Sequence, residues 1–224
     1  MFDEILNINN GFEKKDANEI YLSLLLFVEN NKKKIRFQKH PLGFKYFKLG
    51  KISKTEELRL HFWVETNENQ DDDLQIHDHS FNFESFVVYG SLKNNKFITK
   101  YDNNANGLIY NVRFRNGKSR LTLDSKNQLI ELISSQIIKN GEFYCLNRNE
   151  LHKSENLSES TISLLKIIKP ENKVAQVYSP KILKEIPSFD RTFISDIENL
   201  ILMKQLIKKI KLVKNIANKS IKRP

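Results

Sequence analysis

The sequence contains little cysteine, proline, glycine or tryptophan: its 224 residues include 1 Cys, 5 Pro, 7 Gly and 1 Trp. The single cysteine, Cys145, excludes an internal disulfide and any metal site that needs several thiolates. The apolar stretch Leu22–Val28 is far shorter than the roughly 18 residues that cross a bilayer. The N-terminal residues lack the basic and apolar regions of a signal peptide. We therefore expect a cytoplasmic protein in a reducing compartment.

Positive charge is concentrated toward one end of the chain. The formal net charge is +10, but residues 181–224 hold 11 basic and 4 acidic residues, a net of +7, which leaves +3 for the first 180. Lysine outnumbers arginine 29 to 8, whereas a surface that binds phosphate groups favours the planar fork of arginine. We expect a solvated basic tail and no nucleic-acid partner.

The middle of the chain is typical of a β domain. Residues 35–180 contain short runs rich in β-branched and aromatic residues, separated by turn residues. Asn140-Gly141 between two such runs is a strong hairpin signal. Eight or more short strands at this spacing predict a mainly β, double-sheet antiparallel barrel of the jelly-roll type over residues 35–180. The expected strands are Phe44–Leu49, Leu58–Val64, Phe83–Tyr89, Lys96–Tyr101, Leu108–Phe114, Ser119–Asp124, Ile130–Ile138, Glu142–Asn147 and Thr161–Ile168.

Helical patterns flank this domain on both sides. Asp16 and Glu19 fit a capping box ahead of a mostly apolar stretch, which predicts a helix over residues 16–33 and an N-terminal helical segment over residues 1–34. Residues 181–224 carry a second pattern, an apolar stripe at helical spacing followed by lysines. The stripe consists of Ile197, Leu200, Ile201, Met203, Leu206, Ile207, Ile210, Val213 and Ile216.

The C-terminal pattern predicts a basic amphipathic helix that has two interpretations. Residues 204–223 contain eight basic residues and no acidic one. In the first interpretation the helix packs on the barrel and its lysines lie in water. In the second, residues 200–224 contact an anionic membrane or a partner protein. We favour the first.

Two of the five histidines occur in the sequence Ile76-His77-Asp78-His79. Residues i and i+2 of a strand point to the same face, so His77 and His79 would hold two imidazoles side by side. Neutral imidazole suits Fe(II), Mn, Ni, Cu and Zn alike. The pair indicates one edge of a metal site.

The surroundings of this pair resemble the two motifs of the cupin superfamily. The first motif has His-x-His followed by Glu and then Gly. The second motif begins with Gly, continues with Pro-x-Gly, and ends with His and Asn. In this chain Asn147 and Asn149 replace that Pro and Gly. The resemblance covers residues 58–168 and implies a double-stranded β-helix, the jelly-roll cupin barrel. The residues that match are His77, His79, Glu84, Gly90, Gly141, His152 and Asn156.

Within that superfamily, residues 76–79 and 151–158 look most like the thiol (cysteine) dioxygenases. The resemblance implies a mononuclear Fe(II) centre on His77, His79 and His152, and an oxygenase that uses O₂ on a small polar molecule, thiol or amino-acid related. Two features of that family are missing from this chain. Tyr46 stands where the family has an arginine for the substrate carboxylate, and residues 163–167 lack the family's Ser-His-Tyr segment.

The spacing leaves the role of Glu84 open. Counted forward from His79, Glu84 follows four intervening residues, which the first motif allows for a fourth ligand. Counted backward from Gly90, the usual gap of six residues selects Phe83 instead. Phe83 would then face the metal and Glu84 would point away from it. We favour the three-histidine set over the set that includes Glu84.

Four further residues are candidates for a catalytic role. His61 shares a strand face with Arg59, and we consider His61, Tyr89, Arg113 and Tyr178 as candidate catalytic groups. The leading function is the Fe(II) oxygenase. The alternative is an isomerase-type or non-catalytic cupin that binds a small ligand at the same metal site. Cupins often pair through their sheets, so a homodimer is also expected.

Overall fold

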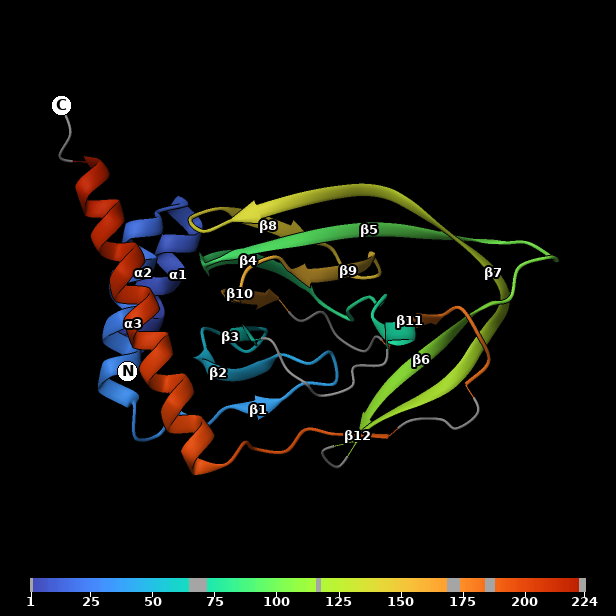
Figure 1. Cartoon of the computed structure of the whole chain (residues 1–224), viewed down its shortest axis with the longest axis horizontal. Helices are drawn as coiled ribbons and strands as arrows, with labels where there is room; N and C mark the ends of the chain where they lie inside the picture. The colour runs from blue at the N-terminus through green and yellow to red at the C-terminus, as the bar shows by residue number, and fades with distance from the viewer. Residues whose placement is uncertain (1, 65–71, 116–117, 169–173, 184–187, 222–224) are drawn as a thin grey trace.

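The computed structural model describes residues 2–64, 72–115, 118–168, 174–183 and 188–221. It is mainly β, with two antiparallel sheets that curl toward each other and helices at one side (Figure 1). The predicted fold class is confirmed. The first sheet has the order β1 (Gln38–Lys39), β2 (Lys45–Lys51), β3 (Glu56–Val64), β10 (Ser160–Ile168), β4 (Asn82–Tyr89) and β8 (Phe143–Leu146).

The second sheet is longer and extends beyond the first. Its order is β11 (Ala175–Ser179), β6 (Gly107–Arg115), β7 (Lys118–Lys139), β5 (Ser91–Tyr101) and β9 (Leu151–Asn156), with β12 (Ser188–Asp190) beside β7. A short 3₁₀ turn, η1 (Asp72–Leu74), precedes the His-x-His segment.

The alternation of side chains in β3 gives the first sheet two different faces. Leu58, Leu60 and Phe62 are fully buried against the helices. The intervening residues, Arg59 and His61, line a cavity between the two sheets. This period-2 pattern therefore separates an apolar core on one side of the sheet from a polar cavity on the other.

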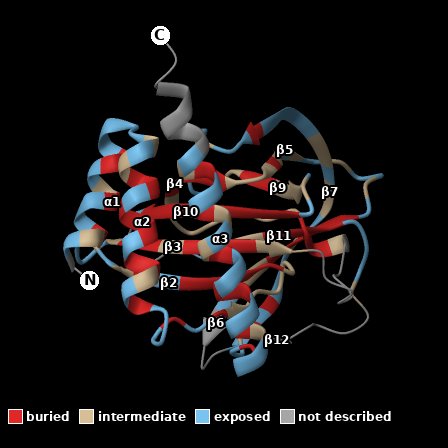
Figure 2. Cartoon of the chain, turned by 60° about the vertical axis from the view of Figure 1, so that its left-hand side comes forward, coloured by how far each residue is buried: buried red, intermediate tan, exposed pale blue. Residues whose placement is uncertain are grey.

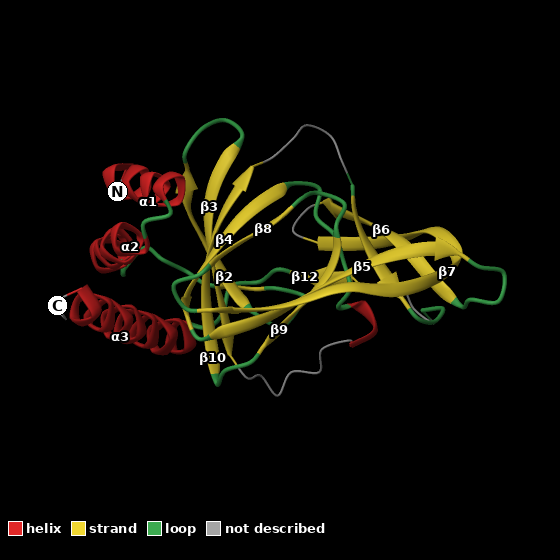
Figure 3. Cartoon of the chain, turned by 90° about the horizontal axis from the view of Figure 1, so that it is seen from above, coloured by secondary structure: helices red, strands yellow, loops and turns green. Residues whose placement is uncertain are grey.

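Three helices lie side by side on the outer face of the first sheet: α1 (Phe2–Lys14), α2 (Ala17–Asn31) and α3 (Asp196–Ile221) (Figure 3). The carboxylate of Asp16 accepts hydrogen bonds from the backbone N–H groups of Asn18 and Glu19, so the predicted cap is confirmed. Figure 2 shows exposed residues along the outer side of these helices and buried residues on the strands behind them.

Helix α1 is absent from the sequence-based expectation, which placed one helix in this segment. Its apolar residues are few, but Ile5, Ile8 and Phe12 recur at spacings of three and four and are buried on one face. Phe12 meets Phe143 of β8 edge to face at 5.9 Å between ring centroids. Asparagines and Gly11 dilute the apolar signal of this helix, and tertiary packing compensates for it.

Helix α3 packs on the body of the protein, as the favoured interpretation requires. Its buried residues differ partly from the predicted stripe, because Ile197, Leu200 and Ile201 are exposed. Ile216 lies where side chains are not described. Along the rest of α3, the residues that face the core are Leu202, Met203, Leu206, Ile210 and Val213.

Polar contacts also join α3 to its neighbours. Lys211 pairs with Glu29 of α2 at 2.7 Å, and the ammonium of Lys209 lies 4.2 Å from the ring centroid of Tyr89 in β4. Among the described residues, the helices are each too short or too polar to span a membrane.

Several strands differ from the sequence-based expectation. The two strands expected at Ser119–Asp124 and Ile130–Ile138 are one strand of 22 residues, β7. The polar residues between them form an irregularity rather than a turn, with Asn127 at a left-handed φ of 57°. The short strands β9 and β11 were not expected, and β12 adds chain beyond residue 180 to the second sheet. Residues 184–187 and 222–224 of the predicted C-terminal segment lie outside the described residues.

Candidate metal centre

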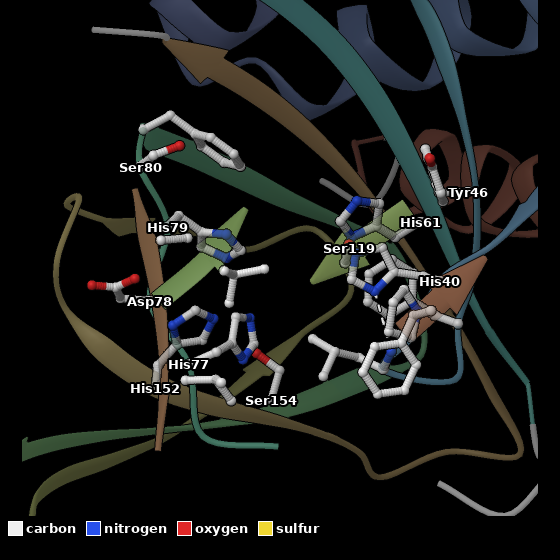
Figure 4. Close-up of a pocket in the computed structure, with 18 of the residues that line it drawn as sticks. His40, Tyr46, His61, His77, Asp78, His79, Ser80, Ser119, His152 and Ser154 are labelled. Carbon is white, nitrogen blue, oxygen red and sulfur yellow. Dashed lines mark hydrogen bonds between the residues drawn. The ribbon is translucent and has the colours of Figure 1, made fainter. Parts of the chain in front are cut away.

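Three histidines from separate parts of the chain meet between the sheets. His77 and His79 lie between η1 and β4, and His152 is the second residue of β9. An isolated antiparallel bridge joins His77 to His152, and another joins His77 to Val177 of β11. Figure 4 shows the three imidazoles grouped on one side of the pocket. The structure therefore brings together the three residues that the sequence motifs singled out.

The imidazoles are close enough to share one ion. Ring centroids are 4.9 Å apart for His77 and His79, 4.4 Å for His77 and His152, and 5.0 Å for His79 and His152. One nitrogen from each ring lies within 4.8 Å of the others. Nitrogens that are each about 2.1 Å from one ion are about 3.0–3.4 Å apart in a facial octahedral or tetrahedral arrangement. The three imidazoles would therefore have to close in by up to roughly 1.5 Å, through ring rotations and small backbone shifts, to hold one metal.

Backbone carbonyls orient two of the rings. Nδ1 of His77 is 2.9 Å from the carbonyl oxygen of Gln75, and Nδ1 of His152 is 3.3 Å from that of Glu150. A carbonyl only accepts hydrogen bonds, so each Nδ1 carries the proton and each Nε2 keeps its lone pair. In metal-binding histidines, a hydrogen bond from the ring nitrogen that does not bind the metal fixes the tautomer in this way. Phe81 stacks on the third ring, that of His79, at 4.7 Å.

Burial keeps these imidazoles neutral. It lowers the pKa of His77 to about 4. It also holds the pKa of His79 and of His152 well below the usual range, and repulsion from the neighbouring histidines lowers both further. A metal binds the deprotonated ring, so the site does not have to lose protons at neutral pH. The donor set and its protonation state both fit a transition-metal ion.

Glu84 lies on the other face of β4. The register pairs Glu84 with Lys166 of β10, and its carboxylate forms an ion pair with Lys15 at the end of α1. Phe83 lines the cavity and meets His79 edge to face at 5.2 Å. The arrangement agrees with the backward count from Gly90 and differs from the forward count. Among the described residues, the metal-ligand cluster contains His77, His79 and His152 without Glu84.

The four candidate catalytic residues lie in three different places. His61 and Arg113 line the same cavity of about 1040 Å³ as the three histidines. Tyr89 faces the helices, where it packs against the core and Lys209. Tyr178 packs with Ile109 and Leu151 and is not among the described lining residues.

The far side of the cavity holds the predicted candidate His61 together with residues that were not predicted from the sequence to belong to the site. His40, Tyr46 and His61 lie across the pocket from the three histidines (Figure 4). Phe44 stacks between His40 and His61, with ring centroids 4.1 Å and 4.3 Å away. Arg191, which follows β12, also lines this side. Its sequence neighbourhood carries no recognisable motif, so only the pairing of β12 with β7 reveals its position.

Asp78 lies between two ligand histidines but points away from their rings (Figure 4). Its backbone and carboxylate both bond to the backbone of Gln176 in β11. Burial raises the pKa of Asp78 to about 6. Asp78 therefore anchors the His-x-His segment to the second sheet.

Comparisons with known proteins give only distant matches. No protein-family model matches the chain, and no curated protein does. The solved structure of the DMSP lyase DddQ from Ruegeria pomeroyi DSS-3 aligns with a TM-score of 0.33 and 8% identity over 59% of this chain, and the chain spans 50% of that lyase's length. Protein SO0799 from Shewanella oneidensis aligns with a TM-score of 0.30 and 14% identity over 82% of this chain and 94% of its own. Nothing about function follows from likenesses this distant.

Proposed function

We propose that the protein is a mononuclear metal enzyme, an Fe(II) oxygenase that holds its metal on His77, His79 and His152. The observation that carries the proposal is the convergence of three neutral imidazoles whose Nδ1 atoms, in two of the three, are already bonded to carbonyls. Histidines that lie together on a surface without binding a metal have no need of hydrogen bonds that orient their rings. The arrangement resembles metal centres in which outer partners fix each ligand.

A metal held by three imidazoles keeps coordination positions open, and iron in such a site supplies oxygen chemistry to a bound substrate. The chain itself contributes a shaped, partly apolar environment. The ring of Phe81 stacks on that of His79, and the ring of Phe83 meets it edge to face. The cavity of about 1040 Å³ gives room for an organic ligand next to the histidines.

The first experiment combines metal binding with oxygen uptake. The purified protein is stripped with a chelator and reloaded anaerobically with Fe(II), because Zn²⁺ binds such sites more tightly than Fe²⁺ and would persist through purification. Oxygen consumption is then followed with thiols, amino acids, hydroxy acids and apolar carboxylic acids. We expect one iron per chain and substrate-dependent uptake.

Two variants separate the metal site from the rest of the cavity. His152→Ala should lose stoichiometric iron and oxygen uptake together. His40→Asn removes a cavity histidine from outside the cluster and should keep one iron per chain. Stoichiometric iron without uptake across the panel would reject the oxygenase and leave a non-oxidative metal site. Failure of the wild type to bind any metal would reject the site itself.

A further inference from the structure

The described residues that line the cavity include more cationic than anionic side chains. Among its described lining residues, Lys48, Arg59, Arg113 and Arg191 are cationic, and Asp78 is the one that carries a carboxyl group. The Asp78 carboxylate already accepts the backbone N–H of Gln176. The cavity therefore presents excess positive charge to whatever enters it, and a low-dielectric, enclosed site strengthens attraction to an anion.

Two of these cations converge on one aromatic ring. The guanidinium carbon of Arg59 lies 5.4 Å from the ring centroid of Tyr46, and that of Arg191 lies 6.0 Å from it. Arg59 comes from β3 and Arg191 from the segment after β12, so distant parts of the chain build this corner. Burial, together with the charges of Arg59 and Arg191, holds the pKa of His61 well below its usual range.

Among the described residues, Glu57 offsets part of this charge. Glu57 is buried and lies 2.7 Å from a terminal nitrogen of Arg59 and 3.8 Å from the ammonium of Lys48. One carboxylate thus serves two cations. It occupies one terminal nitrogen of the Arg59 fork, which leaves donors on the same guanidinium for a second acceptor.

Polar atoms without partners mark the same region. Within the described residues, Nε of Arg59 and Nε1 of Trp63 are buried N–H groups with no hydrogen-bond acceptor. The hydroxyl of Ser119, also buried and unpartnered, comes from the opposite sheet. Buried donors are nearly always satisfied in folded proteins. A cluster of unsatisfied donors around one cavity indicates a missing acceptor.

The wall between this corner and the three histidines is largely apolar. It includes Phe44 and Trp63, whose rings are 4.4 Å apart, and Leu165 and Val177. His40 and His61 line this corner, and His77, His79 and His152 line the other end of the same cavity (Figure 4). A ligand that fills this space would need an apolar body and an anionic end.

We propose that the Arg59–Arg191 corner binds the carboxylate of an organic substrate whose apolar body extends along Phe44 and Trp63 toward the three histidines. This inference rests on the proposed function, because it assigns the substrate of the same metal site. Arginine recognises carboxylates through paired, charge-assisted hydrogen bonds, and the apolar wall favours a hydrocarbon body over a sugar or a free amino acid.

Trp63 offers a direct readout, because it is the single tryptophan of the chain and lines the cavity. Its fluorescence is titrated with benzoate, phenylacetate and 3-phenylpropanoate, and with the neutral amides of the same acids. We expect at least one carboxylate to bind more than about tenfold tighter than its amide, because the amide lacks the charge that Arg59 and Arg191 recognise. Equal binding of acids and amides, or no binding of any acid, would overturn the inference.

Variants test which residues carry the preference. Arg191→Gln should lower carboxylate affinity by about tenfold or more and leave amide affinity unchanged. Arg59→Lys keeps the charge beside Glu57, so it preserves the fold while removing the planar fork. Lys100→Gln removes one positive charge from the exposed end of β5, where Lys100 pairs with Glu131, and should leave both affinities unchanged. Carboxylate affinity that survives both arginine variants would overturn the assignment.

A parallel zinc titration separates this inference from the proposed function. Zinc binding that is the same in wild type and Arg191→Gln, together with a lost acid preference in the variant, supports the three-histidine metal site and the inference. Zinc binding without any acid preference overturns the inference alone. An acid preference that depends on Arg191 in a protein that binds no metal overturns the proposed function and keeps the carboxylate corner.

Discussion

The backbones of His77 and His152 hydrogen-bond to each other in both directions. The His77 N–H donates to the His152 carbonyl at 3.0 Å, and the His152 N–H donates to the His77 carbonyl at 2.8 Å. The two residues are 75 positions apart, yet their main chains form a bridge like that of neighbouring strands. The candidate site is thus held by backbone geometry, which is the kind of support a preorganised metal centre needs.

A substitution of Glu84, which is not one of the three proposed ligands, should leave metal binding unchanged. Glu84→Gln removes a carboxylate that contacts Lys15 on the helix side of β4, so metal affinity should stay within about twofold of wild type. The variant should lose at most about 1 kcal/mol of stability, because the ion pair lies partly in solvent. Zinc titration by calorimetry measures the affinity. A tenfold weaker site in Glu84→Gln would show that Glu84 is a ligand.

Helix α1 should be an integral part of the core. Phe12→Ala removes a fully buried ring and should lower the free energy of unfolding by about 3–5 kcal/mol. Leu6→Ala alters the same helix at a position that is 37% exposed and should cost much less, within about 1 kcal/mol. Urea denaturation compares the two. Similar, small losses for both would mean that α1 contributes little to the core.

The glycines of the two motifs should differ in their tolerance of alanine. Both have left-handed backbones, with φ of 80° at Gly90 and 87° at Gly141. A Cβ at Gly90 would lie 2.5 Å from the carbonyl oxygen of Ser160, whereas at Gly141 the nearest atom is 3.7 Å away. Gly141→Ala should cost about 1 kcal/mol from backbone strain alone, and Gly90→Ala should cost clearly more. Equal melting temperatures of the two variants would contradict this.

His61 should make the metal-free protein less stable in mild acid. Burial and the neighbouring arginines place its folded pKa well below the unfolded value of about 6.5. Between those two pKa values the unfolded chain binds the proton and the folded chain does not, so stability falls as pH drops below about 6.5. Each such histidine contributes at most about 1.4 kcal/mol per pH unit.

The matched variant is His61→Phe, which keeps an aromatic ring next to Phe44. Its free energy of unfolding should fall less than that of wild type between pH 7.5 and pH 5.5. His40 and the metal-binding histidines have lowered pKa values too, so part of the decline should remain. A decline of the same size in both proteins would mean that His61 does not stay neutral in the fold.

The periodicity of the strands predicts the fold class and the His-x-His spacing predicts the pair His77 and His79, whereas the resemblance to the cupin motifs adds His152 to the set. His-x-His spacing and the Gly141-to-His152 interval are short-range features that survive in an otherwise unusual chain. The role of Glu84 required the register of β4, since a shift of one residue exchanges the faces of Phe83 and Glu84. The strand signals at residues 119–138 looked like two strands because the irregularity at Asn127 has the composition of a turn.

The residues that sequence reasoning missed are those placed by long-range pairing. Arg191 reaches the cavity because β12 pairs with β7, and neither residue type nor spacing foretells that contact. Helix α1 depends on the core that α2 and the first sheet provide for Phe12. Tyr89 and Tyr178 were candidate catalytic groups from the sequence, but the direction of a side chain depends on strand register, which composition does not fix.

Zinc X-ray absorption on protein loaded with one equivalent of metal would show directly whether the three histidines bind one ion. It reports the ligand set of the bound ion itself, in wild type and in His152→Ala. We expect three imidazole nitrogens at about 2.0–2.1 Å in the wild type and two in the variant, with weaker binding. A wild-type shell dominated by carboxylate oxygens, or one that is the same in His152→Ala, would contradict a site built from His77, His79 and His152.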